Sequence, residues 1–177
     1  MELTDFFHQL QAEIKATIAE QLGTTEYEYP FPELAFAEHV IQHMISAGMT
    51  FDSATICHHQ GKAGNAILKV TGYALSEDCD QLDLFISLYS EADSLENVAD
   101  SETKTAAEQC LRFLSRSVDG KLVKEVDPSN EAHMLAMTLR DAYANLDQIR
   151  VYVLTDKVAK SKNFKQREIQ GKTVKLE

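Results

Sequence analysis

The chain has 177 residues, of which 44% are apolar and 25% are charged, an ordinary balance for a folded protein with a substantial core. No apolar run approaches the ~20 residues needed to cross a bilayer, and the acidic start MELTDFFHQL is unlike a signal peptide. The net charge of −11 disfavours a protein that wraps a phosphate backbone, because such binding comes largely from lysine and arginine.

Two helices are predicted for the first quarter of the chain. Residues 3–22 carry apolar side chains at helical spacing, and Gly23 is a plausible stop. Two prolines within residues 27–32 indicate a connector. A second helix is predicted over residues 32–47, where Gly48 ends it. Its inward-facing residues are expected to be Ala37, Val40, Ile41, Met44 and Ile45.

The most informative stretch is residues 70–90, VTGYALSEDCDQLDLFISLYS, which predicts two strands joined by an acidic turn. A short strand at 55–59 and a glycine turn at 61–64 are expected before it. The two strands themselves are predicted at 66–75 and 82–89. In the later strand, an aliphatic face alternates with a mixed one, as in a strand that covers a core. The aliphatic residues are Leu82, Leu84, Ile86 and Leu88, and the others are Asp83, Phe85, Ser87 and Tyr89.

The second half of the chain adds helices and strands in alternation. Residues 91–102 are acidic and aperiodic, which predicts a surface loop. Thr105 and Glu108 fit a capping box for a helix that runs to about Val118. Pro128 and Ser129 open another helix, a strand is predicted at 149–154, and a hairpin at 167–177. This order predicts a single α/β domain over residues 1–177, or an α+β one, with a central mixed sheet flanked by helices.

A basic segment begins after the strand at 149–154 and extends into the terminal hairpin. Seven of the 17 basic residues lie between Lys157 and Lys175, against the single acid Glu168. Any contact with nucleic acid is expected there, although a solvated linker and hairpin over 158–177 is the favoured interpretation.

The chain stops in mid-strand, so we expect the N-terminal fragment of a longer protein. Three widely spaced cysteines without a CxxC pair fit free thiols in the cytoplasm.

An acidic cluster in the predicted turn is the first candidate site. Glu77, Asp78, Asp80 and Asp83 lie within seven positions, and carboxylates of this kind can hold Mg²⁺. The alternative is that the first three are turn residues that face solvent. Asp83 alone lies inside a strand, where it is either a relic of a metal site or a polar residue on the outer face of the sheet.

The stretch GYALSEDCDQLDLFISLYS resembles the DGYAxDExxxxLDLFVxDF segment in the N-terminal region of the abortive infection phage resistance (AIPR) family. The likeness extends to the opening MELTDFFHQLQAEI, to the helix and strand before the hairpin, and to the helix after it. The segments IRVYVLTD and EIQG are similar to the VxxxLLTD and EIDG segments of the family. The resemblance therefore covers most of the chain and implies a part in phage defence.

The same family region resembles a PD-(D/E)XK, restriction-endonuclease-like core. Such a site needs an Asp near the start of the hairpin, then Asp or Glu two residues before a Lys, with Mg²⁺ held between the carboxylates. Here Thr71 stands at the first position. Asp83 matches the second, but Phe85 stands where the lysine is required. Glu38 on the predicted second helix is the remaining carboxylate. The resemblance thus implies a degenerate nuclease site.

Three hypotheses follow. The first is a non-catalytic sensing, assembly or regulatory module that uses no cofactor. Its expected partners are the C-terminal portion of a longer protein or a second copy of the chain, and it is not expected to bind a membrane. The second is a Mg²⁺-dependent nuclease in which Glu38, Asp78 and Asp83 bind the metal and Lys69 acts as a migrated catalytic lysine beside Glu38 and Asp83. The third is a protein-interaction domain unrelated to nucleases. Convergence of Glu38, Lys69 and Asp83 on one cation would favour the enzyme.

Overall fold

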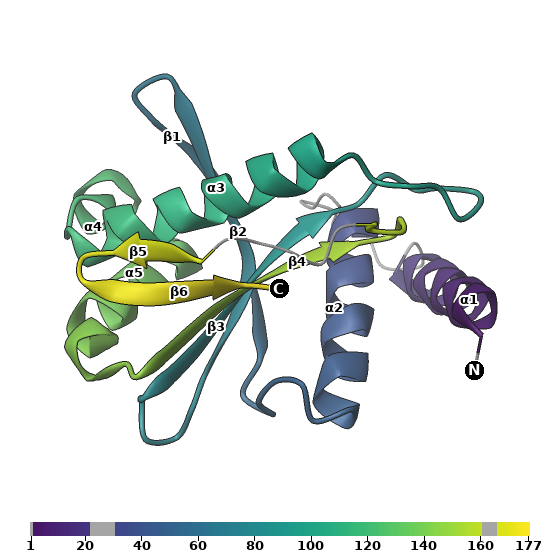
Figure 1. Cartoon of the computed structure of the whole chain (residues 1–177), viewed down its shortest axis with the longest axis horizontal. Helices are drawn as coiled ribbons and strands as arrows, with labels where there is room; N and C mark the ends of the chain where they lie inside the picture. Colours follow the sequence, from purple (N-terminus) through teal and green to yellow (C-terminus); the bar gives the residue numbers. More distant parts are fainter. Residues whose placement is uncertain (1, 22–30, 161–165) are drawn as a thin grey trace.

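The computed structural model of the chain describes residues 2–21, 31–160 and 166–177. A six-stranded mixed sheet crosses the molecule in the order β1-β2-β3-β4-β6-β5 (Figure 1). The strands are β1 (Thr55–Ala63), β2 (Ala66–Leu75), β3 (Gln81–Leu88), β4 (Gln148–Thr155), β5 (Arg167–Ile169) and β6 (Lys172–Leu176). The β3–β4 and β4–β6 pairs are parallel, and the other pairs are antiparallel. The predicted α/β class with a mixed sheet is therefore confirmed.

Helices cover both faces of this sheet (Figure 1). They are α1 (Leu3–Gln21), α2 (Phe31–Ser46), α3 (Asp100–Val118), α4 (Leu122–Glu125) and α5 (Glu131–Ala142), with a 3-10 turn at Tyr143–Asn145. The helices α3 and α5 pack on one face, where they share the larger apolar cluster with β2, β3 and β4. The helix α2 covers the other face, and α1 packs on α2 and contributes Leu10 and Ile14 to a second cluster.

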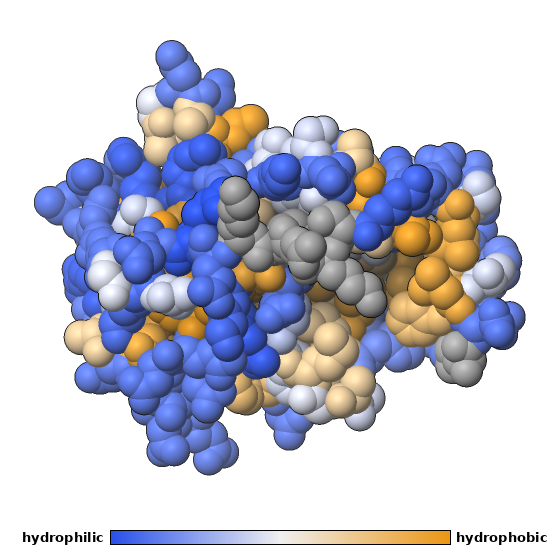
Figure 2. All heavy atoms as spheres, in the orientation of Figure 1, coloured by the Kyte–Doolittle hydropathy of each residue, from blue (hydrophilic) through white to orange (hydrophobic). Residues whose placement is uncertain are grey.

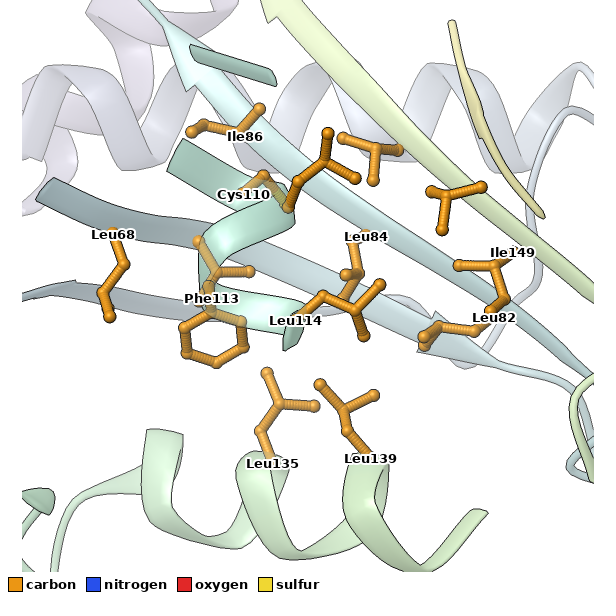
Figure 3. Packing of buried hydrophobic residues seen from close by; sticks show 14 of the residues in the cluster. Leu68, Leu82, Leu84, Ile86, Cys110, Phe113, Leu114, Leu135, Leu139 and Ile149 are labelled. Atoms are coloured by element: carbon orange, nitrogen blue, oxygen red, sulfur yellow. The ribbon is translucent and has the colours of Figure 1, made fainter. Parts of the chain in front are cut away.

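The strand β3 is buried on both faces. Leu82, Leu84 and Ile86 point into the larger cluster, together with Phe113 of α3 and Leu135 of α5 (Figure 3). The opposite face carries Asp83, Phe85 and Ser87, all of which are buried. The alternative that Asp83 lies on an outer face of the sheet is therefore wrong, because α2 and the segment that follows it cover that face. Strands buried on both sides are common where helices flank a sheet with parallel pairs.

Several boundaries differ from the sequence prediction. The strand β1 continues through Gly61, so the turn lies at Gly64 and not at 61–64. The helix α3 begins at Asp100, so Thr105 lies within it and is not part of a cap. Glu102 provides the cap instead, by accepting a hydrogen bond from the Ala99 N–H (3.2 Å). Because Ala99 has no side-chain oxygen, the usual Ser or Thr signal is missing there. Gly23 and most of the predicted connector lie outside the described residues.

Candidate functional site

The buried face beneath α2 carries two polar networks. The first joins Asp83 of β3 to Arg150 of β4, which is its register partner in the parallel pair. Arg150 Nε donates to Asp83 Oδ1 (2.7 Å) and Nη2 donates to Oδ2 (2.8 Å). Thr50, in the segment after α2, also donates its hydroxyl to Oδ2 (2.7 Å). Both oxygens of the only carboxylate in β3 are therefore already hydrogen-bonded.

Aromatic rings complete the surroundings of this ion pair. The Arg150 guanidinium lies 5.4 Å from the centre of the Tyr152 ring and 5.9 Å from that of Phe51. Burial lowers the pKa of Arg150, but the hydrogen bonds and the charge of Asp83 raise it by more, so the guanidinium stays protonated. A bidentate pair of this geometry is the strongest common form of charge-assisted hydrogen bond. A cation could reach Asp83 only by displacing the guanidinium.

The second network connects α2 to the middle of β2 and the end of β3. Glu33, in the first turn of α2, accepts hydrogen bonds from Lys69 Nζ and from Ser87 Oγ (2.6 Å). The Ser87 hydroxyl has one hydrogen, and Glu33 receives it. The 2.9 Å contact between Ser87 Oγ and Thr71 Oγ1 therefore requires the Thr71 hydroxyl to donate. Lys69 is mostly buried, so Glu33 supplies the negative charge that such an ammonium requires.

The strands separate at this second network. The β2–β3 register ends at the Gly72–Phe85 pair. Beyond this pair, the Ser87 N–H donates to the Thr71 hydroxyl (3.0 Å), so a side chain takes the place of a backbone acceptor. The neighbouring strand β1 has a register shift between Ile56 and His59, which is typical of a β-bulge. Both irregularities lie at the same level of the sheet. Lys69 and Thr71, two residues apart in β2, share one face of the strand.

An open cavity of about 270 Å³ adjoins the separated strands. Its walls are Lys69, Ser87 and Leu88 from the sheet, and Ser101, Glu102, Thr105, Ala106 and Gln109 from α3. His58 of β1 lies close to the same charges. Burial lowers the pKa of His58, the charge of Lys69 lowers it further, and Glu33 partly opposes this. Its Nδ1 atom is buried and has no hydrogen-bond partner among the described residues.

The residues predicted for a metal site are not brought together. Glu38 is exposed on α2. Lys69 pairs with Glu33, which lies five residues before Glu38 on the same helix. Asp78 is exposed in the turn between β2 and β3, and Asp83 is buried against Arg150. Within the described ranges, no group of three or more His, Cys, Asp or Glu side chains is arranged to hold a metal ion.

Glu33 and Arg150 are the functional candidates that the sequence analysis missed. Arg150 had a usable signal, because it interrupts the apolar strand IRVYVLT just as Asp83 interrupts LDLFISL. Two charged residues in neighbouring buried strands predict a pair of opposite charges. Glu33 had only its place in the first turn of a helix, where acidic residues are common for local electrostatic reasons.

The basic segment 157–175 is partly engaged in contacts within the domain. Arg167 donates to Glu108 of α3 (2.8 Å), and Lys157 lies 3.7 Å from Glu96. Lys172 Nζ donates to the carbonyl oxygens of Ala144 (3.0 Å) and Leu146 (2.5 Å). These contacts are those of a hairpin held to its own domain. Lys162 and Lys165 lie outside the described residues.

Comparison with protein families gives one assignment. Residues 36–177 match the model of the abortive infection phage resistance protein N-terminal domain. The match spans the sheet and all helices except α1 and the first turn of α2. Comparisons with curated proteins and with solved structures gave no significant match. No described helix has the length and apolar character that a membrane span requires. The chain belongs to the abortive infection phage resistance family, as its N-terminal domain.

Proposed function

We propose that this domain serves a phage-defence protein as a non-catalytic sensing, assembly or regulatory module. The observation that carries the proposal is the Asp83–Arg150 pair, in which the strand carboxylate at the nuclease-like position is neutralised by an arginine. A metal-dependent nuclease needs carboxylates that are free to hold Mg²⁺. Here the buried carboxylate holds two strands together instead. The partners proposed for the module are a C-terminal portion of a longer protein or a second copy of the chain.

The restriction-endonuclease-like core remains part of this proposal as an ancestral scaffold. Its support is the order of elements along the chain, in which α2 is followed by the β2–β3 hairpin, then α3, then β4. Phe85, at the position of the required lysine, is fully buried and stacks on Tyr152 with ring centres 5.7 Å apart. A buried aromatic ring at this position contributes packing energy but no proton or charge.

A metal-dependent nuclease is the second candidate, and one observation favours it. Lys69, Glu33 and Ser87 meet beside an open cavity at the place where β2 and β3 separate. In that case Glu33, and not Glu38, would be the helix carboxylate, and Lys69 the cation that positions an attacking water. Mg²⁺ would be a cofactor only under this alternative.

A cleavage assay separates the two candidates. The 177-residue chain is incubated with single- and double-stranded DNA and RNA in Mg²⁺ or Mn²⁺, alongside the variants Glu33→Gln, Lys69→Met and the exposed control Glu38→Gln. We expect no metal-dependent cleavage above background in any sample. Cleavage that is retained in Glu38→Gln but lost in Glu33→Gln and Lys69→Met, with circular dichroism spectra unchanged, would establish the nuclease and overturn the proposal.

A further inference from the structure

The strand β1 leaves one edge of the sheet open. Among the described strands, only β2 pairs with it. The strand β5, at the opposite edge, has three residues and is charged, and both features protect an edge from pairing with another chain. By contrast, β1 has nine residues, no carboxylate and a single lysine, Lys62. The end of the β1–β2 hairpin projects past α3 in Figure 1 and stands clear of the rest of the surface in Figure 2.

Part of this edge is regular. The register shift before His59 distorts the start of β1, as bulges at sheet edges do. From His59 to Ala63, each residue faces its partner in β2 without interruption, and this stretch is centred on Gly61. A two-residue turn follows, and it begins with Gly64 at a φ of +64°, which suits the first central position of a hairpin turn.

The turn determines which backbone groups of β1 point away from β2. In a hairpin with a two-residue turn, the residues that flank the turn form a hydrogen-bonded pair, and the kind of pair alternates from there. The next pair, Lys62 and Ile67, is therefore not hydrogen-bonded, and its N–H and C=O groups point outward. The Ile67 carbonyl agrees with this, because it accepts a hydrogen bond from Arg112 of α3. On the β1 side, the outward groups of Gln60 and Lys62 have no backbone partner among the described residues.

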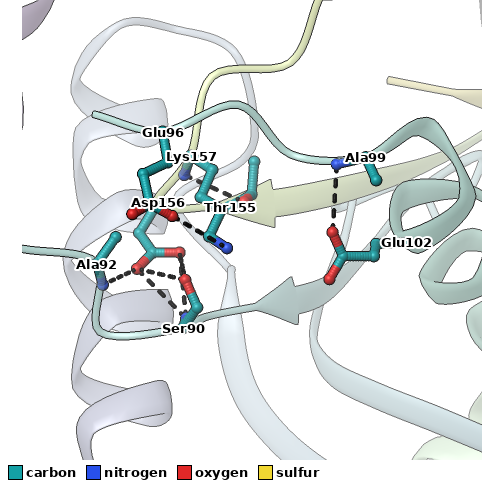
Figure 4. A network of polar contacts seen from close by, with 8 residues as sticks. All are labelled: Ser90, Ala92, Glu96, Ala99, Glu102, Thr155, Asp156 and Lys157. Atoms are coloured by element: carbon teal, nitrogen blue, oxygen red, sulfur yellow. Dashed lines mark hydrogen bonds and ion pairs between the residues drawn. The ribbon is translucent and has the colours of Figure 1, made fainter. Parts of the chain in front are cut away.

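The long connection between β3 and α3 is held far from this edge. Asp156, just after β4, accepts hydrogen bonds from the Ala92 N–H (2.9 Å) and the Ser90 N–H (3.2 Å) (Figure 4). Gln11 of α1 donates to the Ala92 carbonyl (2.6 Å). The connection is thus fixed at the end of β4, and β2 and β3 separate that strand from β1. The β1 edge is left free for another strand.

We propose that a second copy of β1 pairs with this edge in antiparallel orientation, about a two-fold axis at Gly61. In this register, Gln60 of each copy faces Lys62 of the other, and their outward backbone groups exchange hydrogen bonds. Gly61 meets its own copy at a non-hydrogen-bonded position, where Cα atoms approach to about 4.5 Å and a glycine causes no crowding. An axis at Lys62 would place two lysines opposite each other. An axis at Gln60 would carry the pairing into the register shift.

Charge favours a second copy as the occupant. Molecules with a net charge of −11 repel one another, so they associate best through a surface without carboxylates. Residues 53–76, which include all of β1 and β2, contain none of the 28 acidic residues of the chain. A nucleic acid is a poor occupant, because β1 offers one lysine to a phosphate backbone. This inference rests on the proposed function, in which the module assembles with a second copy, and it names the strand through which it does so.

Sedimentation of the 177-residue chain tests for this dimer. The measurement covers concentrations from about 1 μM to 1 mM, the range in which a small interface is expected to associate. We expect a reversible equilibrium between monomer and dimer within that range. The dissociation constant of the wild-type dimer is then the reference for the variants.

Charge substitutions at Gln60 test the register. Gln60→Glu places a carboxylate opposite each Lys62 and should tighten the dimer about fivefold, whereas Gln60→Lys places like charges opposite each other and should weaken it about fivefold. The double variant Gln60→Lys with Lys62→Glu exchanges the two charges, so the dimer should again be at least as tight as wild type. Both side chains are exposed, so the monomer should fold normally in every variant.

The control separates local pairing from long-range repulsion. Repulsion between acidic molecules predicts the opposite order, because Gln60→Glu adds a negative charge to each chain and Gln60→Lys removes part of it. Gln166 is exposed beside β5, at the other edge of the sheet. Gln166→Glu and Gln166→Lys therefore make the same changes of net charge without touching β1, and they should shift the dissociation constant only slightly and in that opposite order.

Three results would overturn the strand-pairing proposal. They are a chain that stays monomeric up to about 1 mM, which would leave the edge to a strand of another protein, a dimer whose Gln60 variants follow the Gln166 controls, and a double variant no tighter than Gln60→Lys. The nuclease assay is independent of these. A chain that cleaves nucleic acid and still dimerises through β1 would contradict the proposed function alone, and a monomer without cleavage would contradict the strand pairing alone.

Discussion

Asp83 and Arg150 face each other across two parallel strands and share two hydrogen bonds of 2.7 and 2.8 Å. The Asp83 side chain is only 1% exposed, and that of Arg150 is 20% exposed. Taking two charges out of water is costly, and their attraction compensates only when the remaining polar atoms are also hydrogen-bonded. Thr50 meets that requirement at Asp83 Oδ2. The pair therefore fixes the register of the two central strands, and Asp83 does not serve to hold a cation.

Breaking this pair is expected to destabilise the protein strongly. Asp83→Ala leaves the Arg150 guanidinium without its carboxylate beneath α2, so the free energy of unfolding should fall by about 3–5 kcal/mol. Urea denaturation followed by circular dichroism measures this change. Asp78→Ala, in the exposed turn of the same hairpin, should change it by less than about 0.5 kcal/mol. A loss below about 1 kcal/mol for Asp83→Ala would refute a structural role for the pair.

Removing both charges together should be far less harmful. In the double variant Asp83→Leu with Arg150→Met, no uncompensated charge is left in the sheet. Such apolar replacements are often neutral or stabilising relative to the buried ion pair. We expect the double variant to recover most of the stability lost in Asp83→Ala, as measured in the same denaturation series. Additive losses would mean that packing, and not charge pairing, dominates at these positions.

The Glu33–Lys69 pair is expected to contribute less to stability than the Asp83–Arg150 pair, but a measurable amount. Glu33→Gln removes the charge that Lys69 meets while keeping an acceptor for Ser87, so a loss of about 1–3 kcal/mol is expected. A double-mutant cycle with Lys69→Met isolates the pairwise energy from other effects. Glu38→Gln, exposed on the same helix, is the control and should be close to neutral. If Glu33→Gln behaves like that control, then the pair does not hold α2 to the sheet.

Gly72 is required where β1 approaches β2. A Cβ atom at this position would lie 2.7 Å from the Thr55 carbonyl oxygen, which is a steric clash. Gly72→Ala should therefore force the two strands apart and lower the unfolding free energy by about 1–3 kcal/mol, as other overpacking changes do. Thermal denaturation tests this, and amide hydrogen exchange should show faster exchange in β1. Wild-type exchange rates in the variant would contradict the observed approach of the strands.

The stability of the fold is expected to fall in mild acid because of two histidines. Burial lowers the pKa of His58 and His59 below the ordinary value of 6.5. The unfolded chain then binds protons that the folded chain does not, so stability is complete above about pH 6.5 and falls as the pH drops below it. Melting temperatures between about pH 5 and 8 should show this loss. His58→Gln should reduce the slope of melting temperature against pH. An unchanged slope in His58→Gln, in His59→Gln and in the double variant would assign the pH dependence to other groups.

The sequence predicted what depends on local pattern and failed where distant side chains decide. The apolar spacing of residues 3–22 and 32–47 predicted α1 and α2 closely, and the alternation around Leu84 located β3. The start of α3 was misplaced because Ala99 carries no capping oxygen. Glu33 and Lys69 are 36 positions apart, and no local rule brings them together. The surroundings of Asp83 stayed open between two alternatives, because one strand does not reveal which helix will cover it.

The position of Glu33 has a consequence for dissecting the protein. The family similarity begins at Phe36, inside α2, whereas Glu33 lies almost one turn earlier. A fragment trimmed to residues 36–177 would keep Lys69 and Ser87 but discard the Glu33 carboxylate that accepts hydrogen bonds from both. It would also lose α1, which packs on α2 and contributes Leu10 and Ile14 to the second apolar cluster. The segment matched by the family model is thus shorter than the packed structure, and trimming to that segment should yield a less stable protein.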